Sequence, residues 1–179
     1  MINGFDLAVA EWFYSIRNDC LTSAFAFITH FGDVWFITAL CILLILISYT
    51  RNNGFTWPLI AGAVTAALLQ RLLKYMVKRP RPDIDMFLIE QGGYSFPSGH
   101  SLTGLVFYGF AIFLIRKKFP GRKLTKVLTF ILASLIFLLG LSRLYLGVHY
   151  VTDVLSGWAF GGILLFILIK IYQRYSKPC

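Results

Sequence analysis

The chain has 179 residues, of which 58% are hydrophobic and only 14% are charged, and its mean hydropathy is +0.71. An average soluble domain carries about 25% charged residues. This composition therefore excludes a soluble globular protein and predicts one all-α domain, residues 1–179, whose solvent is the lipid bilayer. The net charge of +9 does not indicate a nucleic-acid partner, because most of the positive charges lie between apolar segments.

The N-terminal segment has an apolar stripe at helical spacing. Five apolar residues fall at i, i+4, i+7, i+8 and i+11, namely Phe5, Val9, Trp12, Phe13 and Ile16, the pattern of a helix with one apolar face. Polar residues interrupt the stripe, so we expect an amphipathic helix in the membrane interface, followed by a shorter apolar stretch over 21–31. The alternative is that this helical hairpin inserts more deeply as a sixth span.

Five longer apolar segments follow, each close to the roughly 20 residues that a helix needs to cross the hydrocarbon core. They cover residues 34–50, 55–71, 98–115, 124–142 and 151–169. The sequence therefore predicts a multi-pass membrane helical bundle with five transmembrane helices plus an N-terminal interfacial helical hairpin. Small residues in the last segment are expected to allow close helix packing: Ser156, Gly157, Gly161 and Gly162.

Basic residues predict the orientation of the bundle. Helices that alternate in direction place most cations on one side: Arg51, Arg116, Lys117, Lys118, Arg122, Lys123, Lys126, Lys170, Arg174 and Lys177. By the positive-inside rule this side is cytoplasmic. A second basic group lies on the opposite side, against the rule: Lys74, Lys78, Arg79 and Arg81. Binding of lipid headgroups and a specific function are both open explanations for it.

The first of three motifs on that opposite side runs from Lys74 to Pro82, with the sequence KYMVKRPRP. Pro80 and Pro82 are expected to end the helix and force an extended segment. Lys74 is then on the last helical turn, and Arg81 projects from the rigid segment beyond it. Two cations of fixed direction suit a phosphate group, which Arg can bind in a bidentate manner. An ordinary solvated basic loop is the alternative.

The second motif is Pro97-Ser98-Gly99-His100, at the start of the third apolar segment. A helix N-terminus presents free amide groups and a positive dipole end, which favour an anion. Gly99 allows a ligand to approach the backbone, and Ser98 adds a hydroxyl donor. A capped helix start without a ligand is the alternative. The acidic residues of the preceding loop are expected to be solvated: Asp83, Asp85 and Glu90.

The third motif joins Ser142 and Arg143 to His149 and Asp153. The i, i+4 spacing predicts that His149 and Asp153 share one helix face. An Asp on one imidazole nitrogen fixes the tautomer and leaves the other nitrogen available as a nucleophile. A purely structural His–Asp pair is the alternative. The remaining histidine, His30, is isolated in an apolar stretch, and we interpret it as structural.

Together the three motifs resemble the signature of the type 2 phosphatidic acid phosphatases, which is K-x6-R-P, then P-S-G-H, then S-R-x5-H-x3-D. Every fixed position is matched: Lys74, Arg81, Pro82, Pro97, Ser98, Gly99, His100, Ser142, Arg143, His149 and Asp153. The resemblance implies an integral-membrane lipid phosphatase, and members of the family commonly have six spans.

The resemblance also implies a role for each residue. His149 would attack phosphorus and form a phosphohistidine, with Asp153 orienting it, and His100 would protonate the departing lipid oxygen and later activate water. The phosphoryl oxygens would be held, as their charge redistributes, by Lys74, Arg81, Ser98, Gly99 and Arg143. Because these cations already stabilise the charge, no metal ion or other cofactor is expected.

The expected partners are the bilayer and a lipid phosphate substrate, with the active site on the extracytoplasmic side of the cell membrane. Outer-face chemistry on a small enzyme makes undecaprenyl diphosphate the first expectation, with phosphatidylglycerol phosphate or phosphatidate as alternatives. Two other classes remain open. One is a metal-dependent hydrolase with His100, His149 and Asp153 as ligands, and the other is a phospholipid carrier that does not cleave its ligand. The sequence does not indicate an oligomeric state.

Overall fold

The computed structural model describes residues 4–50, 56–82 and 84–175. Arg51, Asp83 and Lys177 lie outside the described residues. Within the described ranges every regular element is helical, which confirms the all-α fold. The helices are α1 Gly4–Ser15, α2 Asp19–Thr29, α3 Val34–Thr50, α4 Thr56–Val77, α5 Gly99–Lys118, α6 Lys123–Tyr145 and α7 Val151–Tyr175, with short 3-10 turns η1 His30–Gly32 and η2 Ile84–Met86.

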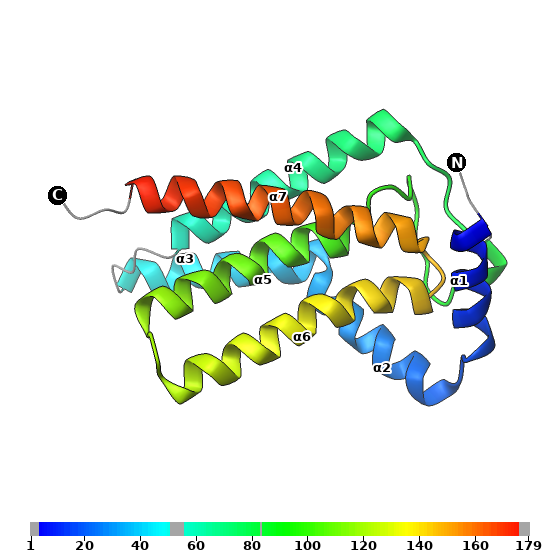
Figure 1. Cartoon of the computed structure of the whole chain (residues 1–179), viewed down its shortest axis with the longest axis horizontal. Coiled ribbons are helices and arrows are strands. Elements are labelled where there is room, and N and C mark those ends of the chain that lie inside the picture. Colours follow the sequence, from blue (N-terminus) through cyan, green and yellow to red (C-terminus); the bar gives the residue numbers. More distant parts are fainter. Residues whose placement is uncertain (1–3, 51–55, 83, 176–179) are drawn as a thin grey trace.

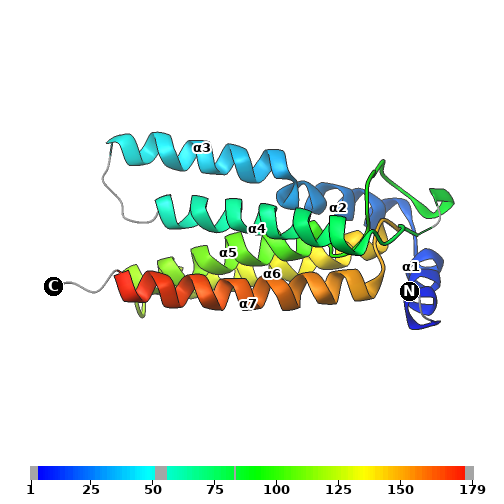
Figure 2. The same ribbon diagram turned by 90° about the horizontal axis from the view of Figure 1, so that it is seen from above.

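Helices α3 to α7 run along the long axis of the molecule, and α1 lies across one end of it (Figures 1 and 2). α5 is the central helix, because it packs against α4, α6 and α7, whereas α3 lies at the outer edge beside α4. A stripe of α5 side chains at every fourth position is almost fully buried, as expected for an apolar face that meets its neighbours: Leu102, Val106, Phe110 and Leu114.

Close packing of α7 on α5 depends on two of the four small residues that the sequence singled out. A Cβ atom at Gly157 would lie 2.8 Å from the carbonyl oxygen of Ser98, and one at Gly161 would lie 3.0 Å from that of Leu102. Gly162 has no such close neighbour. The two glycines therefore let the start of α5, with its motif residues, lie against the start of α7.

The number of membrane spans depends on how the N-terminal helices are counted. Among the described residues, α4, α5, α6 and α7 are long and apolar enough to cross a membrane. The segments Asp19–Gly32 and Val34–Ile47 meet at a 48° bend and pass the same test as a pair. Counting this pair as one broken span gives the five spans predicted from the sequence. The structure thus joins α2 to α3, whereas the sequence analysis grouped α2 with α1 in an interfacial hairpin.

α1 has the features of an interfacial helix. Its 12 residues span about 18 Å at 1.5 Å per residue, which is too short for a hydrocarbon core of about 30 Å. Val9, Phe13 and Ile16 pack against the bundle. Phe5 and Trp12 of the same predicted stripe are more than half exposed, as expected for side chains that contact lipid.

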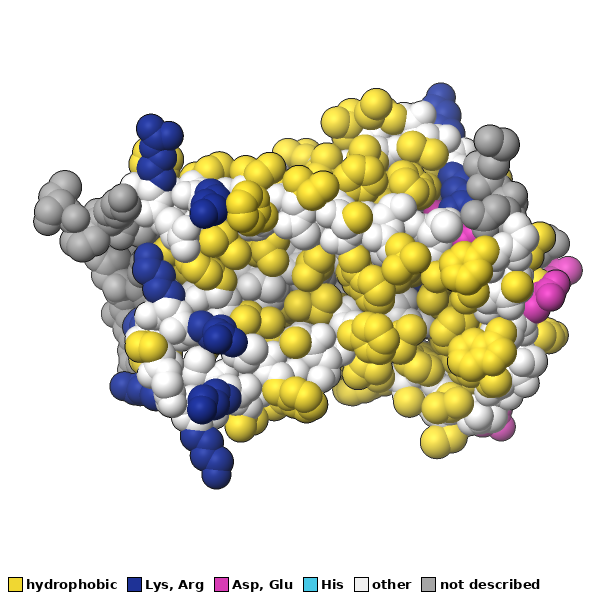
Figure 3. All heavy atoms as spheres, viewed as in Figure 1, with side chains coloured by type: hydrophobic (Ala, Val, Ile, Leu, Met, Phe, Trp, Pro, Cys, Tyr) yellow, Lys and Arg dark blue, Asp and Glu magenta, His cyan; other side chains and the backbone are white. Residues whose placement is uncertain are grey.

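The surface shows the polarity of the bundle. Hydrophobic side chains cover the middle of the visible face, and Lys and Arg gather at the end that contains the α5–α6 loop (Figure 3). The loops that carry the three motifs lie at the opposite end, next to α1 (Figure 1). This arrangement matches the separation of the two basic groups that alternation of the spans predicts.

The turn between α6 and α7 depends on Gly147. Its φ of 76° lies in the left-handed region, and a Cβ atom there would be 2.1 Å from the carbonyl oxygen of Met86. Glycine adopts this conformation without steric cost. The neighbouring carbonyl oxygen of Leu146 accepts a hydrogen bond from the backbone N–H of Leu88. The turn is therefore fixed against the 84–95 loop, and it directs His149 toward the centre of the molecule.

Candidate active site

Three cations from different elements converge at the motif-bearing end of the bundle. Lys74 is on the last turn of α4, as predicted, and its Nζ donates to the carbonyl oxygen of Tyr94 over 2.5 Å. Arg81 follows in the extended segment and donates to the carbonyl oxygen of Val148 over 2.7 Å. Arg143, on the last turn of α6, is 1% exposed. Each cation is thus held in a fixed direction, which phosphate binding requires.

Arg143 has two polar side-chain partners that the sequence did not indicate. Its guanidinium donates to Thr29 Oγ1 over 2.8 Å and to Gln91 Oε1 over 2.5 Å. Thr29 is at the end of α2, and Gln91 is in the loop before α5. Neither residue belongs to a motif, so only the fold reveals that they orient this cation.

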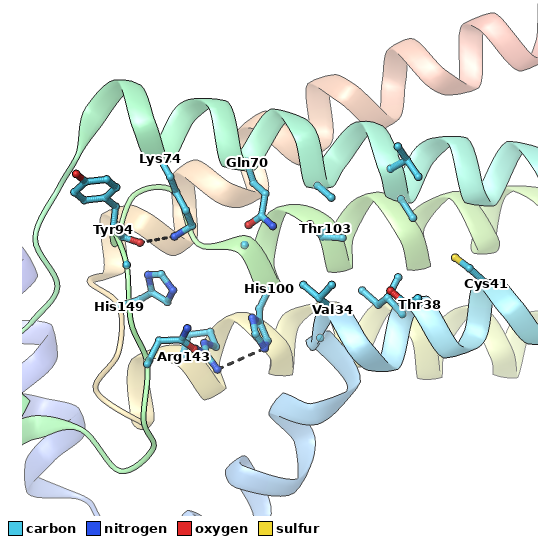
Figure 4. A pocket seen from close by; sticks show the side chains of 18 of the residues that line it. Val34, Thr38, Cys41, Gln70, Lys74, Tyr94, His100, Thr103, Arg143 and His149 are labelled. Atoms are coloured by element: carbon cyan, nitrogen blue, oxygen red, sulfur yellow. Dashed lines mark hydrogen bonds between the residues drawn. The ribbon is translucent and has the colours of Figure 1, made fainter.

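The three cations line a single cavity of about 500 Å³ together with His100 and His149. Figure 4 shows Lys74, Arg143, His100 and His149 around its polar end, and Val34, Thr38 and Cys41 of α3 facing its other end. The apolar part continues between α3 and α4, where it is lined by Ile37, Ile42, Ile45, Ile60, Ala63, Val64 and Ala67. The cavity therefore joins a cationic end to an apolar groove between two membrane-embedded helices.

Ser98 and Gly99 have different positions relative to this cavity. Gly99 lines it, and a Cβ atom at Gly99 would lie 2.0 Å from Gln70 Oε1. Ser98 is fully buried as the N-cap of α5, where its hydroxyl oxygen accepts a hydrogen bond from Ser101 Oγ over 3.0 Å. A phosphate-binding role for Ser98 stays a prediction, since its side chain here caps the helix.

His149 and Asp153 form the predicted pair, but from a different local structure. His149 precedes α7, and Asp153 is on the first turn of that helix, so the expectation of one shared helix face is wrong. The turn after Gly147 nevertheless brings His149 Nδ1 within 3.5 Å of Asp153 Oδ2. Ser95, which belongs to no motif, donates its hydroxyl to Asp153 Oδ2 and lies 3.4 Å from His149 Nδ1.

The outer nitrogen of His149 faces the cavity. Arg81 Nη1 lies 3.3 Å from His149 Nε2. Because a guanidinium can only donate, this contact requires an unprotonated Nε2 and places the ring proton on Nδ1, toward Asp153. The tautomer is therefore the one in which the lone pair of Nε2 points into the cavity, toward Arg81.

Burial controls the protonation of the two groups in this contact. His149 is only 4% exposed. This burial lowers the pKa of His149 well below its usual value; the hydrogen bond to Asp153 opposes the shift, and the charges of Arg143, Arg81 and Lys74 add to it. Burial also lowers the pKa of Arg81 to about 10. At neutral pH the imidazole is thus neutral and the guanidinium is charged.

His100 has an acidic partner that the motifs do not include. His100 Nε2 lies 3.1 Å from Asp33 Oδ1 and 3.5 Å from Arg143 Nη1. The other oxygen of Asp33 lies 2.9 Å from His30 Nδ1, and the His30 side chain is 70% exposed. His30 is therefore not isolated, as the sequence suggested, but is the exposed end of a His–Asp–His chain. The only sequence signal for Asp33 is its position at a junction between apolar segments.

The proposed ligand set of a metal-dependent hydrolase is not assembled. In the part of the chain that the structure describes, no three His, Cys, Asp or Glu side chains are grouped so as to hold a metal ion. His100 is paired with Asp33, whereas His149 is paired with Asp153.

These motifs and their geometry match a known family. The sequence profile of the PAP2 superfamily matches residues 55–177. The chain belongs to this family. Phosphatidylglycerophosphatase B of Bacillus subtilis is 35% identical over 176 residues, which are 96% of this chain and 85% of that protein. The crystal structure of a PAP2-type phosphatidylglycerolphosphate phosphatase from Bacillus subtilis superimposes with a TM-score of 0.86, at 32% identity, over 96% of this chain and 86% of that one.

Two further relatives are less similar to this chain. An undecaprenyl-diphosphatase of Sulfolobus acidocaldarius is 30% identical over 84% of this chain and 70% of that protein. The crystal structure of LpxE from Aquifex aeolicus superimposes with a TM-score of 0.71, at 27% identity, over 92% of this chain and 94% of that one. This PAP2 protein is accordingly a multi-pass membrane enzyme, a lipid phosphatase.

Proposed function

We propose that this PAP2 enzyme hydrolyses the terminal phosphate of phosphatidylglycerol phosphate through a phosphohistidine on His149. The observation that carries the proposal is the single cavity that joins three cations and two histidines to an apolar groove. The choice of substrate follows the Bacillus subtilis phosphatidylglycerophosphatase B, which is similar over 96% of the chain, against 84% for the undecaprenyl-diphosphatase. It replaces our first expectation, undecaprenyl diphosphate.

The shape of the cavity supports a phospholipid substrate. Lys74, Arg81 and Arg143 surround one end, where a phosphate dianion would be held by three charge-assisted contacts. The groove between α3 and α4 begins at this end and is apolar, so an acyl chain can extend along it while the headgroup stays at the cations. A water-soluble phosphate ester would leave this apolar groove unused.

The first chemical step follows from the orientation of His149. Its Nε2 attacks phosphorus, a P–N bond forms, and the ester P–O bond breaks. The departing lipid oxygen takes a proton from His100, which acts as the general acid. Asp153 and Ser95 hold Nδ1 of His149, so that the ring can carry positive charge as the bond to phosphorus forms. Arg81, Lys74 and Arg143 compensate the charge on the phosphoryl oxygens.

The second step returns the enzyme to its starting state. His100, now neutral, takes a proton from a water molecule that attacks phosphorus, and the P–N bond breaks. Inorganic phosphate is released, and His149 is again neutral with its proton on Nδ1. No step of this scheme needs a metal ion, since the three cations supply the positive charge.

We also propose that the site faces the extracytoplasmic side of the cell membrane. Its support is the concentration of Lys and Arg at the other end of the bundle, around the α5–α6 loop (Figure 3), which the positive-inside rule assigns to the cytoplasm.

The test is phosphate release by the purified full chain from phosphatidylglycerol phosphate, phosphatidate and undecaprenyl diphosphate. We expect the highest kcat/KM with phosphatidylglycerol phosphate. His149→Asn, which keeps much of the buried side-chain volume, should lose at least about three orders of magnitude, each tenfold equal to about 1.4 kcal/mol. Faster hydrolysis of undecaprenyl diphosphate would reject the substrate, and activity of His149→Asn above a few per cent would reject the mechanism. Tight lipid binding without phosphate release would favour a carrier.

A further inference from the structure

A chain of buried ion pairs connects α1 to Asp153, the carboxylate that faces His149. Arg79 lies in the segment after α4, at a variable position of the first motif, and is 7% exposed. Its Nη1 donates to Asp153 Oδ1 over 2.6 Å, and its Nη2 donates to Asp6 Oδ2 over 2.6 Å. Asp6 and Asp153 are both fully buried. One guanidinium thus bridges two carboxylates that are 147 positions apart in the sequence.

Asp6 is also bound to the start of α7. Its Oδ1 accepts hydrogen bonds from the backbone N–H and the hydroxyl of Thr152, over 3.1 and 2.8 Å. Arg79 Nη1 donates to the same hydroxyl over 2.7 Å. Carboxylates are favoured at the N-terminus of a helix by its dipole. α1, the segment after α4, and the first turn of α7 therefore meet in one polar cluster beside the active site.

The two oxygens of Asp153 have separate partners. Oδ2 faces His149 Nδ1 and accepts hydrogen bonds from Ser95 Oγ and from the backbone N–H of Tyr150. Oδ1 faces Arg79. Because both oxygens are held, the carboxylate plane has one orientation relative to the His149 ring. Arg79 supplies the contact on the side away from the ring, and Asp6 holds Arg79.

Stability alone does not account for such a cluster. A buried ion pair loses much of its Coulombic gain to desolvation, and well-packed apolar residues of similar size are often as stable. A role in orienting a reacting group gives a reason for charged residues at these positions.

We propose that Arg79 and Asp6 are positioning residues for His149, so that the interfacial helix α1 is part of the catalytic apparatus. Arg79 acts on His149 through Asp153, and Asp6 fixes the position and balances the charge of Arg79. The inference rests on the phosphohistidine mechanism proposed above.

The proposal predicts opposite electrostatic effects for its two members. The charged groups that act on His149 directly are Lys74 from α4, Arg81 from the segment after it, Arg143 from α6 and Asp153 from α7. Arg79 contacts the far oxygen of Asp153. Removing the charge of Asp6 leaves Arg79 unbalanced, which weakens Asp153 as a hydrogen-bond acceptor and lowers the pKa of His149. Removing the charge of Arg79 has the reverse effect and raises the pKa of His149. A purely structural role predicts no such opposition.

The experiment uses the full chain with Asp6→Asn, Arg79→Gln and Arg79→Lys, and Glu11→Gln as the matched control. Glu11 is an exposed carboxylate on the same helix α1. Titration of the ring by ¹⁵N NMR is feasible because the chain has only three histidines. The titration midpoint of His149 should move down in Asp6→Asn and up in Arg79→Gln, and stay near that of the wild type in Arg79→Lys and Glu11→Gln.

Kinetics with phosphatidylglycerol phosphate supply the second readout. We expect kcat to fall roughly 10- to 100-fold in Asp6→Asn and Arg79→Gln, the range known for the loss of an outer hydrogen-bond partner of a metal-binding histidine, with little change in KM. Arg79→Lys should lose less, because it keeps the charge but not the two-sided contact. Glu11→Gln should keep the wild-type kcat.

The inference is wrong if Asp6→Asn and Arg79→Gln both keep the wild-type kcat, or if their His149 midpoints move together or not at all. If Asp6→Asn does not fold, the kcat of Arg79→Lys becomes the test. A wild-type kcat in that variant would reject the inference. A different result would show that the proposed mechanism itself is wrong, namely activity of the His149→Asn variant. The NMR titration needs no substrate, so it tests the inference independently of the catalytic mechanism.

Discussion

Asp33 Oδ1 lies 3.1 Å from Nε2 of His100, although the two residues are 67 positions apart in the chain. Asp33 stands between η1 and α3, at the bend of the broken span. It presents its second oxygen to the exposed His30. The proposed general acid is therefore the inner member of a chain of ionisable groups that reaches the surface at His30.

Asp33→Asn tests this relationship. We expect kcat for phosphatidylglycerol phosphate to fall at least about tenfold, because His100 loses the partner that orients it as an acid. p-Nitrophenyl phosphate should be affected much less, since its leaving group departs without protonation. Asp85→Asn is the matched control, because Asp85 is an exposed acid in the 84–95 loop. An equal loss with both substrates would mean that Asp33 acts on the fold and not on proton transfer.

Vanadate should inhibit the enzyme, and chelators should not. Lys74, Arg81 and Arg143 line one end of the cavity and can hold the oxygens of a five-coordinate vanadate, which resembles the transition state of phosphoryl transfer. Inhibition constants for wild type and Arg143→Lys measure the effect, and the Lys variant should bind vanadate more weakly because it loses the planar fork. Inactivation by a chelator that zinc or magnesium reverses would instead support a metal-dependent hydrolase.

The apolar groove should select for lipid substrates. Val64 lines the groove and is 53% exposed, so Val64→Trp can fill the groove without repacking the core. We expect its KM for a long-chain phospholipid phosphate to rise at least about tenfold, with nearly unchanged kcat/KM for a short-chain analogue, since most binding energy of the long chain comes from buried apolar area. Leu72→Trp, on the exposed surface of the same helix, is the control. Equal effects of the two variants would exclude the groove as the acyl-chain site.

The orientation can be measured by labelling single cysteines in intact cells. In a chain whose native cysteines are replaced, Asp85→Cys should react with a thiol reagent that cannot cross membranes. Pro120→Cys should react with it only after lysis. Asp85 is exposed in η2 and Pro120 is exposed in the α5–α6 loop. The loop that follows α4 and the α5–α6 loop lie at opposite ends of the bundle (Figure 1). The reversed pattern would place the site in the cytoplasm.

Local sequence determined the parts of this protein that depend on local physics. Long apolar segments become helices in a bilayer because every backbone group must be hydrogen-bonded there, so α4, α5, α6 and α7 were predictable. Pro80 and Pro82 follow the end of α4 and fix the relative positions of Lys74 and Arg81. The three motifs predicted the family and six residues that line the cavity, namely Lys74, Arg81, Gly99, His100, Arg143 and His149. Ser98 caps α5 instead, and Asp153 lies behind His149.

Only the tertiary structure decided which residues support that site. Asp33, Ser95 and Gln91 carry no periodic signal, and their partners come from other elements of the fold. The same holds for Asp6, one of the polar residues that interrupt the N-terminal apolar stripe, which is buried against Arg79. Spacing predicted the pairing of His149 with Asp153. The assumption that both lie on one helix was wrong, because the turn at Gly147 brings His149 to Asp153. Pairings between distant segments follow from helix packing and burial of charge, and no local pattern in the sequence specifies them.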